Sequence, residues 1–352
     1  MTRTMRLLAS ASVLAAASVA VSPAFAAGTT AGTTVTNQVT LDYKVGGIDQ
    51  NQVTASDSFK VDRKVNLTVT ETGGAATTVT PGQTGAVTTF SVTNSSNAPL
   101  DFALAATQLD GGTAAHGRTD NFDVTNLKVY ADTNGNNSYD PGTDQETTYL
   151  DQVPADTSRS VFIVADAPLG RATNDAAGVR LTATAAEATA SGTLGATVTQ
   201  TTGANTADVD TVFADTDAGG NVARNGIHFA EDDYVILAAS LTATKTSRVI
   251  SDPFNGTTNP KMIPGAVVEY CIAVANAADS ATATGVNLSD EVPAQTTYDP
   301  AFGIKLNGTV TGSSCNDDGT SGGSYANGIV SGTLENLAGG VARTLVFRVS
   351  VK

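Results

Sequence analysis

The polar segment 132–144 holds the residues in this sequence best suited to binding a metal ion. Oxygen-bearing residues stand at alternate positions through its first part and again at its end: Asp132, Asn134, Asn136, Ser138, Asp140 and Asp144. In a tight loop this spacing directs successive oxygen ligands toward one point, as calcium-binding loops of about twelve residues do. Ser138 would contribute its backbone carbonyl. The spacing therefore predicts a structural Ca²⁺ site, the one cofactor that the sequence suggests.

The same segment departs from the calcium pattern at two positions. Thr143 stands where a bidentate glutamate is expected, with Asp144 one residue later, and Asn137 replaces the usual glycine at position 6. Asp and Asn side chains also accept hydrogen bonds from nearby backbone N–H groups in turns. A second interpretation therefore stays open, in which the segment is an Asx-rich hairpin turn stabilised by its own side chains.

Cys271 and Cys315 are the two cysteines of the chain. In an exported protein the simplest expectation is a disulfide between them. In the strand expected over 267–274, Cys271 faces away from the apolar side formed by Val268, Tyr270, Ile272 and Val274. The bond would tie the Gly/Ser/Asn-rich loop 307–327 to the outer face of that strand. Closing 44 positions (315 − 271) should stabilise the fold by roughly 3–4 kcal/mol. Free thiols or metal ligation are the alternatives, but no histidine lies nearby in the sequence.

A covalent crosslink is a further possibility in the last third of the chain. An intramolecular isopeptide bond needs a lysine, an asparagine acceptor and an acid to shuttle protons, and Lys245, Asn276 and Glu269 supply these types. A surface lysine and a structural asparagine explain the same residues without any such chemistry, so both interpretations stay open.

The sequence lacks the usual signatures of an enzyme. His116 and His228 are the two histidines; they lie far apart in polar stretches, and we expect both to face solvent. Adjacent acids at 232–233 and 317–318 could in principle form a glycosidase pair, but surface charge is the simpler interpretation. No nucleophile elbow, metal-binding histidine pair or phosphate loop occurs in the sequence. We therefore predict a protein that is not an enzyme and has no catalytic residues.

A segment of the chain occurs twice, about half its length apart. Pro81, an alternating strand pattern and Asn94 return as Pro264, a second such pattern and Asn276. Pro264 follows Pro81 by 183 positions (264 − 81), and a second matching pair of runs, 159–164 and 343–347, begins 184 positions apart (343 − 159). Nearly constant offsets across two matches indicate a duplicated domain.

The repeated units predict an all-β protein with two immunoglobulin-like β-sandwich domains in series. Short runs with the strand period alternate with turns rich in Gly, Pro and Asn, and no long segment keeps the helical period of 3.6. The first sandwich is expected over 64–168 and the second over 241–352. Between them, 169–240 is rich in Ala, Thr and Gly, and it is expected to be either a β-extension of the first sandwich or a disordered linker.

Residues 27–63 are expected to form an N-terminal β-hairpin arm. Val39, Leu41, Tyr43 and Val45 alternate with polar residues, and Gly46-Gly47 is a two-residue turn signal before a second strand at 52–61. The arm has no counterpart immediately before the second repeat.

Residues 1–26 predict an export signal. Arg3 and Arg6 precede the small apolar stretch 7–21, and Ala24 and Ala26 suit a small-x-small cleavage site. That stretch is short for a membrane anchor, and no later run predicts a transmembrane span. We expect an exported protein of the periplasm, the cell surface or the extracellular space. Its formal net charge of −15 argues against nucleic acid, which requires basic patches.

The second repeat resembles a known family. The segment 244–270, which contains Pro264-Gly265-Ala266-Val267-Val268-Glu269-Tyr270, is similar to the opening of the bacterial conserved-repeat surface domain (domain of unknown function 11). Asn276 and the run 286–298 continue the pattern, and the first repeat matches loosely. The resemblance implies immunoglobulin-like sandwiches in secreted, cell-wall or outer-surface proteins, and it brings no catalytic residues.

Together these features predict an exported, non-catalytic structural or adhesive surface protein that is acidic, self-assembling and calcium-stabilised. Its expected partners are copies of itself or proteins of the envelope or matrix, joined through exposed strand edges and the N-terminal arm. The alternative is a secreted module that binds a glycan or a protein. A glycan reader usually stacks sugars on aromatic side chains, and the chain has no Trp.

Overall fold

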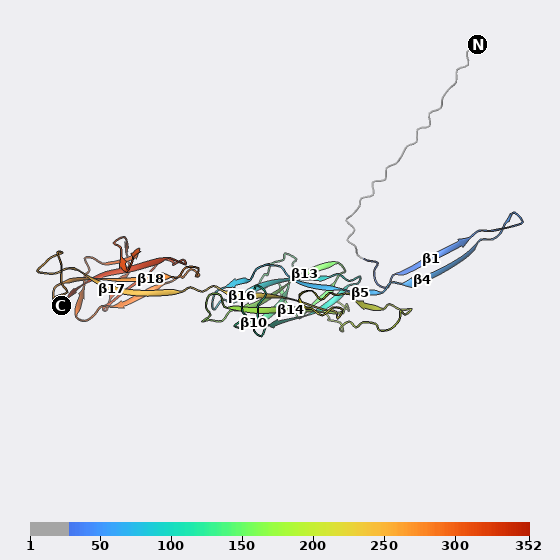
Figure 1. The fold of residues 1–352 in the computed structure, drawn as a ribbon, viewed down its shortest axis with the longest axis horizontal. Helices are drawn as coiled ribbons and strands as arrows, with labels where there is room; N and C mark the ends of the chain where they lie inside the picture. Colours follow the sequence, from blue (N-terminus) through green and yellow to red (C-terminus); the bar gives the residue numbers. More distant parts are fainter. Residues whose placement is uncertain (1–27) are drawn as a thin grey trace, which may run out of the picture.

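The computed structural model describes residues 28–352, and over this range the protein is all-β, as predicted. The one helical element there is a short 3₁₀ turn, η1 (Ala218–Gly220). No helix in this range has the length and apolar character needed to cross a membrane. The predicted export signal, 1–26, lies outside the described residues. Figure 1 shows an elongated molecule, with a ribbon at one end, a sandwich in the middle and a second sandwich at the other end.

The N-terminal arm is a two-stranded antiparallel ribbon. It consists of β1 (Thr34–Leu41) and β4 (Val53–Lys60), and its tip adds the short pair β2 (Lys44–Val45) and β3 (Ile48–Asp49). The base of the ribbon is fixed to the first sandwich through Asn97. The Asn97 side-chain amide donates to the carbonyls of Thr29 (3.0 Å) and Asp62 (2.8 Å), so the chain is held on both sides of the ribbon.

The first sandwich consists of two five-stranded sheets. In hydrogen-bonding order, the first sheet is β11 (Gln145–Glu146), β10 (Thr125–Ala131), β13 (Thr157–Asp166), β8 (Ala86–Asn94) and β6 (Leu67–Glu71). The second is β12 (Tyr149–Val153), β9 (Leu100–Gln108), β14 (Ala176–Glu187), β16 (Ile227–Ile236) and β7 (Thr77–Val79). A short parallel pair, β5 (Arg63–Val65) and β15 (Thr211–Phe213), lies beside them.

Period-two alternation accounts for the core of this sandwich. Every second residue of β8 is buried, because successive side chains of a strand point to opposite faces. Phe90, Phe102, Leu181 and Tyr234 come from both sheets, are inaccessible to solvent and belong to one apolar cluster. The hydroxyl of Tyr234 donates to the carbonyl of Ile163 at 2.9 Å, which satisfies its polar end inside the core.

The second sandwich packs a larger sheet against a smaller one. The larger sheet is β17 (Leu241–Ser251), β18 (Val267–Asn276), β27 (Ala342–Val351), β21 (Ile304–Gly308) and β24 (Thr320–Ser321), with β20 (Thr296–Tyr298) also paired to β27. The smaller sheet is β19 (Asn287–Glu291), β26 (Ile329–Thr333) and β25 (Ser324–Ala326). A separate hairpin joins β22 (Val310–Thr311) to β23 (Ser314–Cys315). Phe347, Leu345 and Leu337 are fully buried between the sheets.

The two repeated segments occupy equivalent places in the two sandwiches. In the first, β8 pairs antiparallel with β13, and in the second, β18 pairs antiparallel with β27. Each unit ends its repeated strand on a buried asparagine, Asn94 or Asn276. Each of these side chains donates to two backbone carbonyls and accepts from one backbone N–H. The repeat found in the sequence is therefore also a repeat of strand pairing and of one buried polar contact.

The segment 169–240 is part of the first sandwich. Its strand β14 pairs with β9 on one side and with β16 on the other, in the middle of the second sheet. Val179, Leu181 and Ile236 from this segment lie in the core. The boundary expected at 168 therefore does not divide the structure. The sequence did not show that this segment belongs to the core, because small alanines fill much of the buried face of β14 and give the segment a low apolar content.

Residues 237–240 join the two sandwiches and are hydrogen-bonded to both. The Leu237 N–H donates to the Val79 carbonyl (2.8 Å), and the Ala238 N–H donates to Thr173 Oγ1 (3.0 Å). On the other side, the Ser240 N–H donates to Asn276 Oδ1 (2.9 Å). The linker is thus held at each end by the domain that it adjoins.

Candidate functional site

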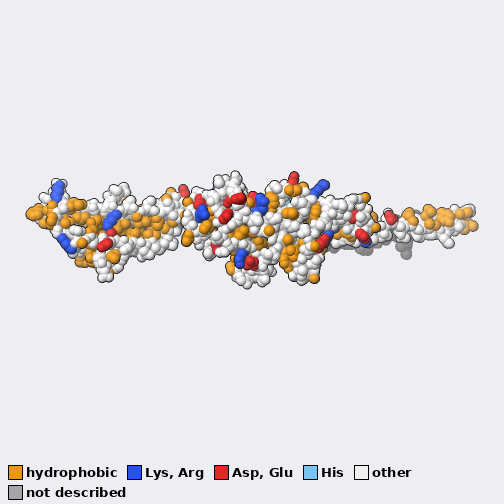
Figure 2. All heavy atoms as spheres, turned by 90° about the horizontal axis from the view of Figure 1, so that it is seen from below, with side chains coloured by type: hydrophobic (Ala, Val, Ile, Leu, Met, Phe, Trp, Pro, Cys, Tyr) orange, Lys and Arg blue, Asp and Glu red, His pale blue; other side chains and the backbone are white. Residues whose placement is uncertain are grey.

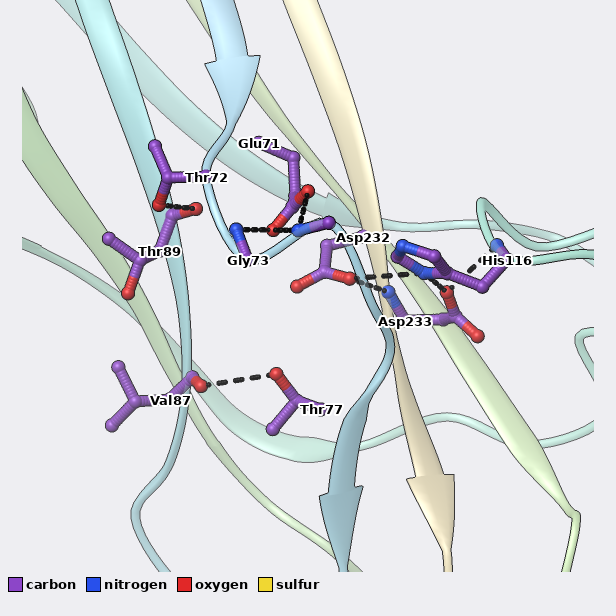
Figure 3. Close-up of polar contacts among 10 residues, drawn as sticks. Glu71, Thr72, Gly73, Thr77, Val87, Thr89, His116, Asp232 and Asp233 are labelled. Atoms are coloured by element: carbon purple, nitrogen blue, oxygen red, sulfur yellow. Dashed lines mark hydrogen bonds and ion pairs between the residues drawn. The ribbon is translucent and has the colours of Figure 1, made fainter.

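The closest grouping of chemically active side chains is His116 with Asp232 and Asp233 (Figure 3). His116 Nδ1 lies 2.5 Å from Asp233 Oδ1 and 3.5 Å from Asp232 Oδ1. Among residues 28–352, these three form the one group of three or more His, Cys, Asp or Glu whose candidate ligand atoms all lie within 4.8 Å of one another.

Two elements distant in the sequence bring this group together. Asp232 and Asp233 are consecutive in β16, and His116 is at the turn of a small loop between β9 and β10. The loop is closed by a bridge between Thr113 and Thr119. Asp120 anchors it, because its carboxylate accepts from the N–H groups of Gly111 (2.8 Å) and Gly178 (2.9 Å). The backbone N–H of His116 also donates to Asp233 Oδ1 at 3.1 Å.

The two carboxylates are buried in a region of negative charge. The side chains of Asp232 and Asp233 are 2% and 0% exposed, whereas that of His116 is 23% exposed. The pKa of Asp232 is raised to about 7, mainly by burial and to a smaller extent by the negative charges of Glu71 and Asp233. The Asp233 N–H and the charge of His116 act in the opposite direction on that pKa. Figure 3 shows Glu71 beside this pair, at the end of β6.

The expectation that both histidines face solvent and that the acids at 232–233 are surface charge was wrong. Asp232 and Asp233 are buried, His116 is half-buried and His228 is buried. Apolar residues follow the acids in the run Tyr234-Val235-Ile236, so the strand itself was visible in the sequence. No local signal shows that a loop more than a hundred positions earlier in the chain places a histidine against it.

His228 has a separate structural role on the same strand. The Val69 N–H donates to His228 Nδ1 at 3.1 Å, which requires that this nitrogen carry no proton. Burial lowers the pKa of His228, although the nearby Asp215 charge opposes the shift. Because the folded state holds the proton more weakly than the unfolded state, His228 favours folding above its ordinary pKa near 6.5, and this contribution is lost as the pH falls below it.

We expect His228→Asn to flatten the pH dependence of the first sandwich, because an amide oxygen can accept from Val69 without titrating. The melting temperature of the native protein should fall relative to that of the variant between pH 7.5 and pH 5.5. Scanning calorimetry of both proteins across this range measures the difference. A melting-temperature difference that is constant with pH would show that His228 does not titrate in this way.

The segment 132–144 forms a compact polar loop whose side chains bond to one another. Asp132 accepts from the N–H groups of Gly135 (2.7 Å) and Asn137 (2.8 Å), and Asp144 accepts from that of Asp140 (2.7 Å). Asp140 accepts from the amide groups of Asn134 and Asn136, and the Asn136 oxygen accepts from the Ser138 N–H. All six residues of the predicted calcium site are thus brought into one loop, with the internal contacts that an Asx-rich turn would have. Calcium binding there stays a prediction.

The predicted disulfide is confirmed. Cys271 and Cys315 are bonded, with their Cα atoms 5.7 Å apart. As expected, Cys271 faces away from the main core, and with Cys315, Val346 and Phe302 it forms a small apolar cluster on the outer face. The bond attaches the hairpin of β22 and β23 to β18.

The three residues considered for an isopeptide crosslink lie in separate contacts. Lys245 Nζ contacts the Asp290 carboxylate at 2.6 Å and lies over the Tyr270 ring. Glu269 is buried between Arg248 (2.7 Å) and Arg348 (2.9 Å). The Asn276 amide nitrogen donates to two carbonyls. Each residue therefore has an ordinary structural role.

The ribbon presents the largest run of uncovered apolar side chains in the described residues. On one face, cross-strand pairs join Val35 to Phe59, Val39 to Ala55 and Leu41 to Val53, with Asn37 and Asp57 as the polar exception. The opposite face consists of Thr34, Lys60, Thr36, Ser58, Gln38, Ser56, Thr40 and Thr54. Every residue of both strands is exposed, including Val39 and Phe59 at 63%. Figure 2 shows hydrophobic side chains gathered along this end of the molecule.

Comparison with solved structures finds distant likenesses. No family model and no curated protein matches the chain. One similar solved structure is a chain from a chaperone–tip adhesin complex of CFA/I fimbriae biogenesis, with 8% identity, a TM-score of 0.23 and coverage of 79% of this chain and 86% of that one. Another, from Corynebacterium diphtheriae and described as a membrane-anchored protein, has 10% identity, a TM-score of 0.19 and coverage of 91% and 89%. At these TM-scores neither likeness supports an argument about function.

Proposed function

We propose that this chain is an exported, non-catalytic structural protein of a bacterial surface, and that it assembles through its N-terminal ribbon. The observation that supports this most strongly is the one-sided apolar face of the ribbon, defined by Val35, Val39, Leu41, Val53, Ala55 and Phe59. The disulfide suits an oxidising location outside the cytoplasm. The resemblance of the second repeat to the conserved-repeat surface domain agrees with the same location.

We expect the apolar face of this ribbon to be packed against a partner in the assembled protein. An isolated two-stranded hairpin is marginally stable in water, and it gains stability by packing an apolar face against another element. Soluble monomers rarely expose a contiguous apolar surface of this kind, and such surfaces usually mark interaction sites. Apart from the Asn37–Asp57 pair, the register of β1 and β4 places the apolar side chains on one face and the polar side chains on the other, so one face is suited to a partner and the other to water.

We assign a second copy of the same chain as the partner. The apolar face carries a single charged side chain, Asp57, at its centre, and Asn37 lies opposite it across the ribbon. Two such faces can meet about a twofold axis if the Asn37 amide of each copy donates to an Asp57 carboxylate, which supplies the hydrogen bond that a buried carboxylate needs. The result would be a four-stranded sandwich of two ribbons, the arrangement that buries the apolar residues of both copies.

The test compares equal charge added to the two faces. Val39→Lys with Phe59→Lys should raise the dissociation constant of the self-association at least about 100-fold, because each buried apolar side chain contributes roughly 1.5–3 kcal/mol. Thr40→Lys with Ser58→Lys adds the same charge to the polar face and should leave association unchanged. Sedimentation velocity over a wide concentration range measures both.

Two results would contradict the proposal. One is a native protein that stays monomeric at every concentration, in which case a different protein would have to cover the ribbon. The other is equal dissociation in the two lysine variants, because net charge rather than the apolar face would then govern the association.

A further inference from the structure

We infer that His116, Asp232 and Asp233 bind a divalent transition-metal ion, with Zn²⁺ as the best match to their donor atoms. This inference does not depend on the proposed assembly through the ribbon. It goes beyond the calcium site predicted at 132–144, which lies on another loop and offers oxygen donors only.

The spacing of the donor atoms suits such an ion. In a tetrahedral site with metal–ligand bonds of about 2.0–2.2 Å, the ligand atoms lie about 3.3–3.6 Å apart. His116 Nδ1 is 3.5 Å from Asp232 Oδ1 and 2.5 Å from Asp233 Oδ1, and all three candidate ligand atoms lie within 4.8 Å. His116 Nδ1 and Asp232 Oδ1 already have tetrahedral spacing, and rotation of the Asp233 or His116 side chain that lengthens the 2.5 Å separation by about 1 Å would bring that pair to it as well. Water can complete the coordination on the exposed side of His116.

A second observation also points to a ligand. Asp233 is completely buried, and its Oδ2 atom has no hydrogen-bond partner. A buried carboxylate oxygen without a partner is costly, and such groups usually indicate an ion or a water bound beside them. A metal ion on Asp233, or a water that the ion holds, would satisfy this oxygen.

The charge of the site favours a cation. Asp232, Asp233 and the nearby Glu71 place three acidic side chains around a single imidazole. Glu71 accepts from the N–H groups of Gly73 and Gly74 and so remains at the end of β6 as a fixed neighbour. The imidazole nitrogen distinguishes between cations, because calcium and magnesium take oxygen ligands whereas zinc takes nitrogen and carboxylate together.

The elements that hold the donors are already fixed. Asp120 anchors the loop of His116, and both aspartates belong to a strand paired along its length with β14. On the other side of β16, pairing with β7 begins only at Tyr234, so the strand edge at the aspartates is not covered by β7. Metal binding would tie the 110–120 loop to this edge of the first sandwich.

The chain offers a built-in control, because His116 and His228 are its only histidines. One equivalent of Zn²⁺ is added to the ¹⁵N-labelled protein, and the side-chain nitrogens of both histidines are followed by NMR. We expect the Nδ1 resonance of His116 to shift and those of His228 to stay, together with a rise in the melting temperature of the first sandwich. The same amount of Ca²⁺ should leave the His116 resonances in place.

Variants then test the ligands. His116→Ala and Asp233→Asn should each weaken Zn²⁺ binding at least about 10-fold in calorimetry, the smallest loss expected for a group that touches the metal or its ligands. Asp132→Asn, in the other polar loop, should not change the affinity. Asp233→Asn keeps the shape of the side chain. Its Zn²⁺ affinity therefore tests the site even if His116→Ala folds poorly.

Several results would overturn the inference. These are unmoved His116 resonances at one equivalent of Zn²⁺, an affinity that both ligand variants retain, or a loss of binding in Asp132→Asn alone. The last result would place the metal on the 132–144 loop instead.

Discussion

Replacing Asn276 with alanine is expected to destabilise the second sandwich by about 3–5 kcal/mol. The side chain is 2% exposed and makes three hydrogen bonds, to the carbonyls of Ala281 and Leu337 and from the N–H of Ser240. Alanine leaves these three backbone groups without their partner, the Leu337 carbonyl in a buried place and the Ala281 and Ser240 groups in part-buried ones. A buried backbone group that loses its hydrogen-bond partner costs about 1–3 kcal/mol. The expected total lies at the lower end of the sum for three groups, because water reaches the part-buried ones.

The repeat supplies a matched experiment for this prediction. Asn94 is fully buried and bonds in the same way, to the carbonyls of Ala98 and Val153 and from the N–H of Ser96. Asn94→Ala should therefore lower the unfolding free energy of the first sandwich by a similar amount. Urea unfolding, with each sandwich followed as its own transition, separates the two effects.

The exposed Asn287 provides the control, since Asn287→Ala should change stability by less than about 0.5 kcal/mol. A loss below about 1 kcal/mol in Asn276→Ala would contradict the prediction, since the three bonds would then contribute no more than a single ordinary one.

Removing the disulfide is expected to destabilise the second sandwich by about 3–4 kcal/mol. The bond closes a loop with a sequence separation of 44. In the chain-entropy model the closed loop restricts the unfolded chain, so removing the bond raises the conformational entropy of the unfolded state and favours unfolding. The double variant Cys271→Ala with Cys315→Ala avoids leaving an unpaired thiol. Its unfolding free energy is compared with that of the native protein by urea denaturation.

Reductant serves as an independent check on the same bond. Dithiothreitol should destabilise the native protein to about the same extent and should not affect the double variant. Equal stability of the two proteins under oxidising conditions would show that the outer-face packing of Val346 and Phe302, rather than the covalent link, holds this loop.

Strand alternation made much of the fold predictable. In β8 every second residue is buried, and in β18 Val268, Ile272 and Val274 lie in the core, so the face of each strand that meets the core could be identified from the sequence. The same argument placed Cys271 on the outer face, where the structure has it. Alternation is a local property, and it identifies which residues share a face.

The partner of a face is not a local property, and here the sequence was less informative. The strands at 176–187 and 227–236 could not be placed in the second sheet, because nothing in them specifies pairing with β9 or β7. For the same reason the sequence did not show that the apolar face of Val39 and Leu41 lacks a cover within the chain. The His116 group depends on a contact between a loop and a strand more than a hundred positions apart, and no spacing rule foresees it.

The arrangement of the last sandwich has a mechanical consequence. Leu241, next to the linker, begins β17 at the Asn276 end of β18, whereas Ser350 of β27 lies opposite Val267 at the other end. A pull between the linker and Val351 would therefore load β17, β18 and β27 along their length. Because ladder hydrogen bonds run across the strands, the strands would have to slide and break many bonds together rather than unzip one at a time. This sandwich is thus built to resist tension along the long axis of the molecule.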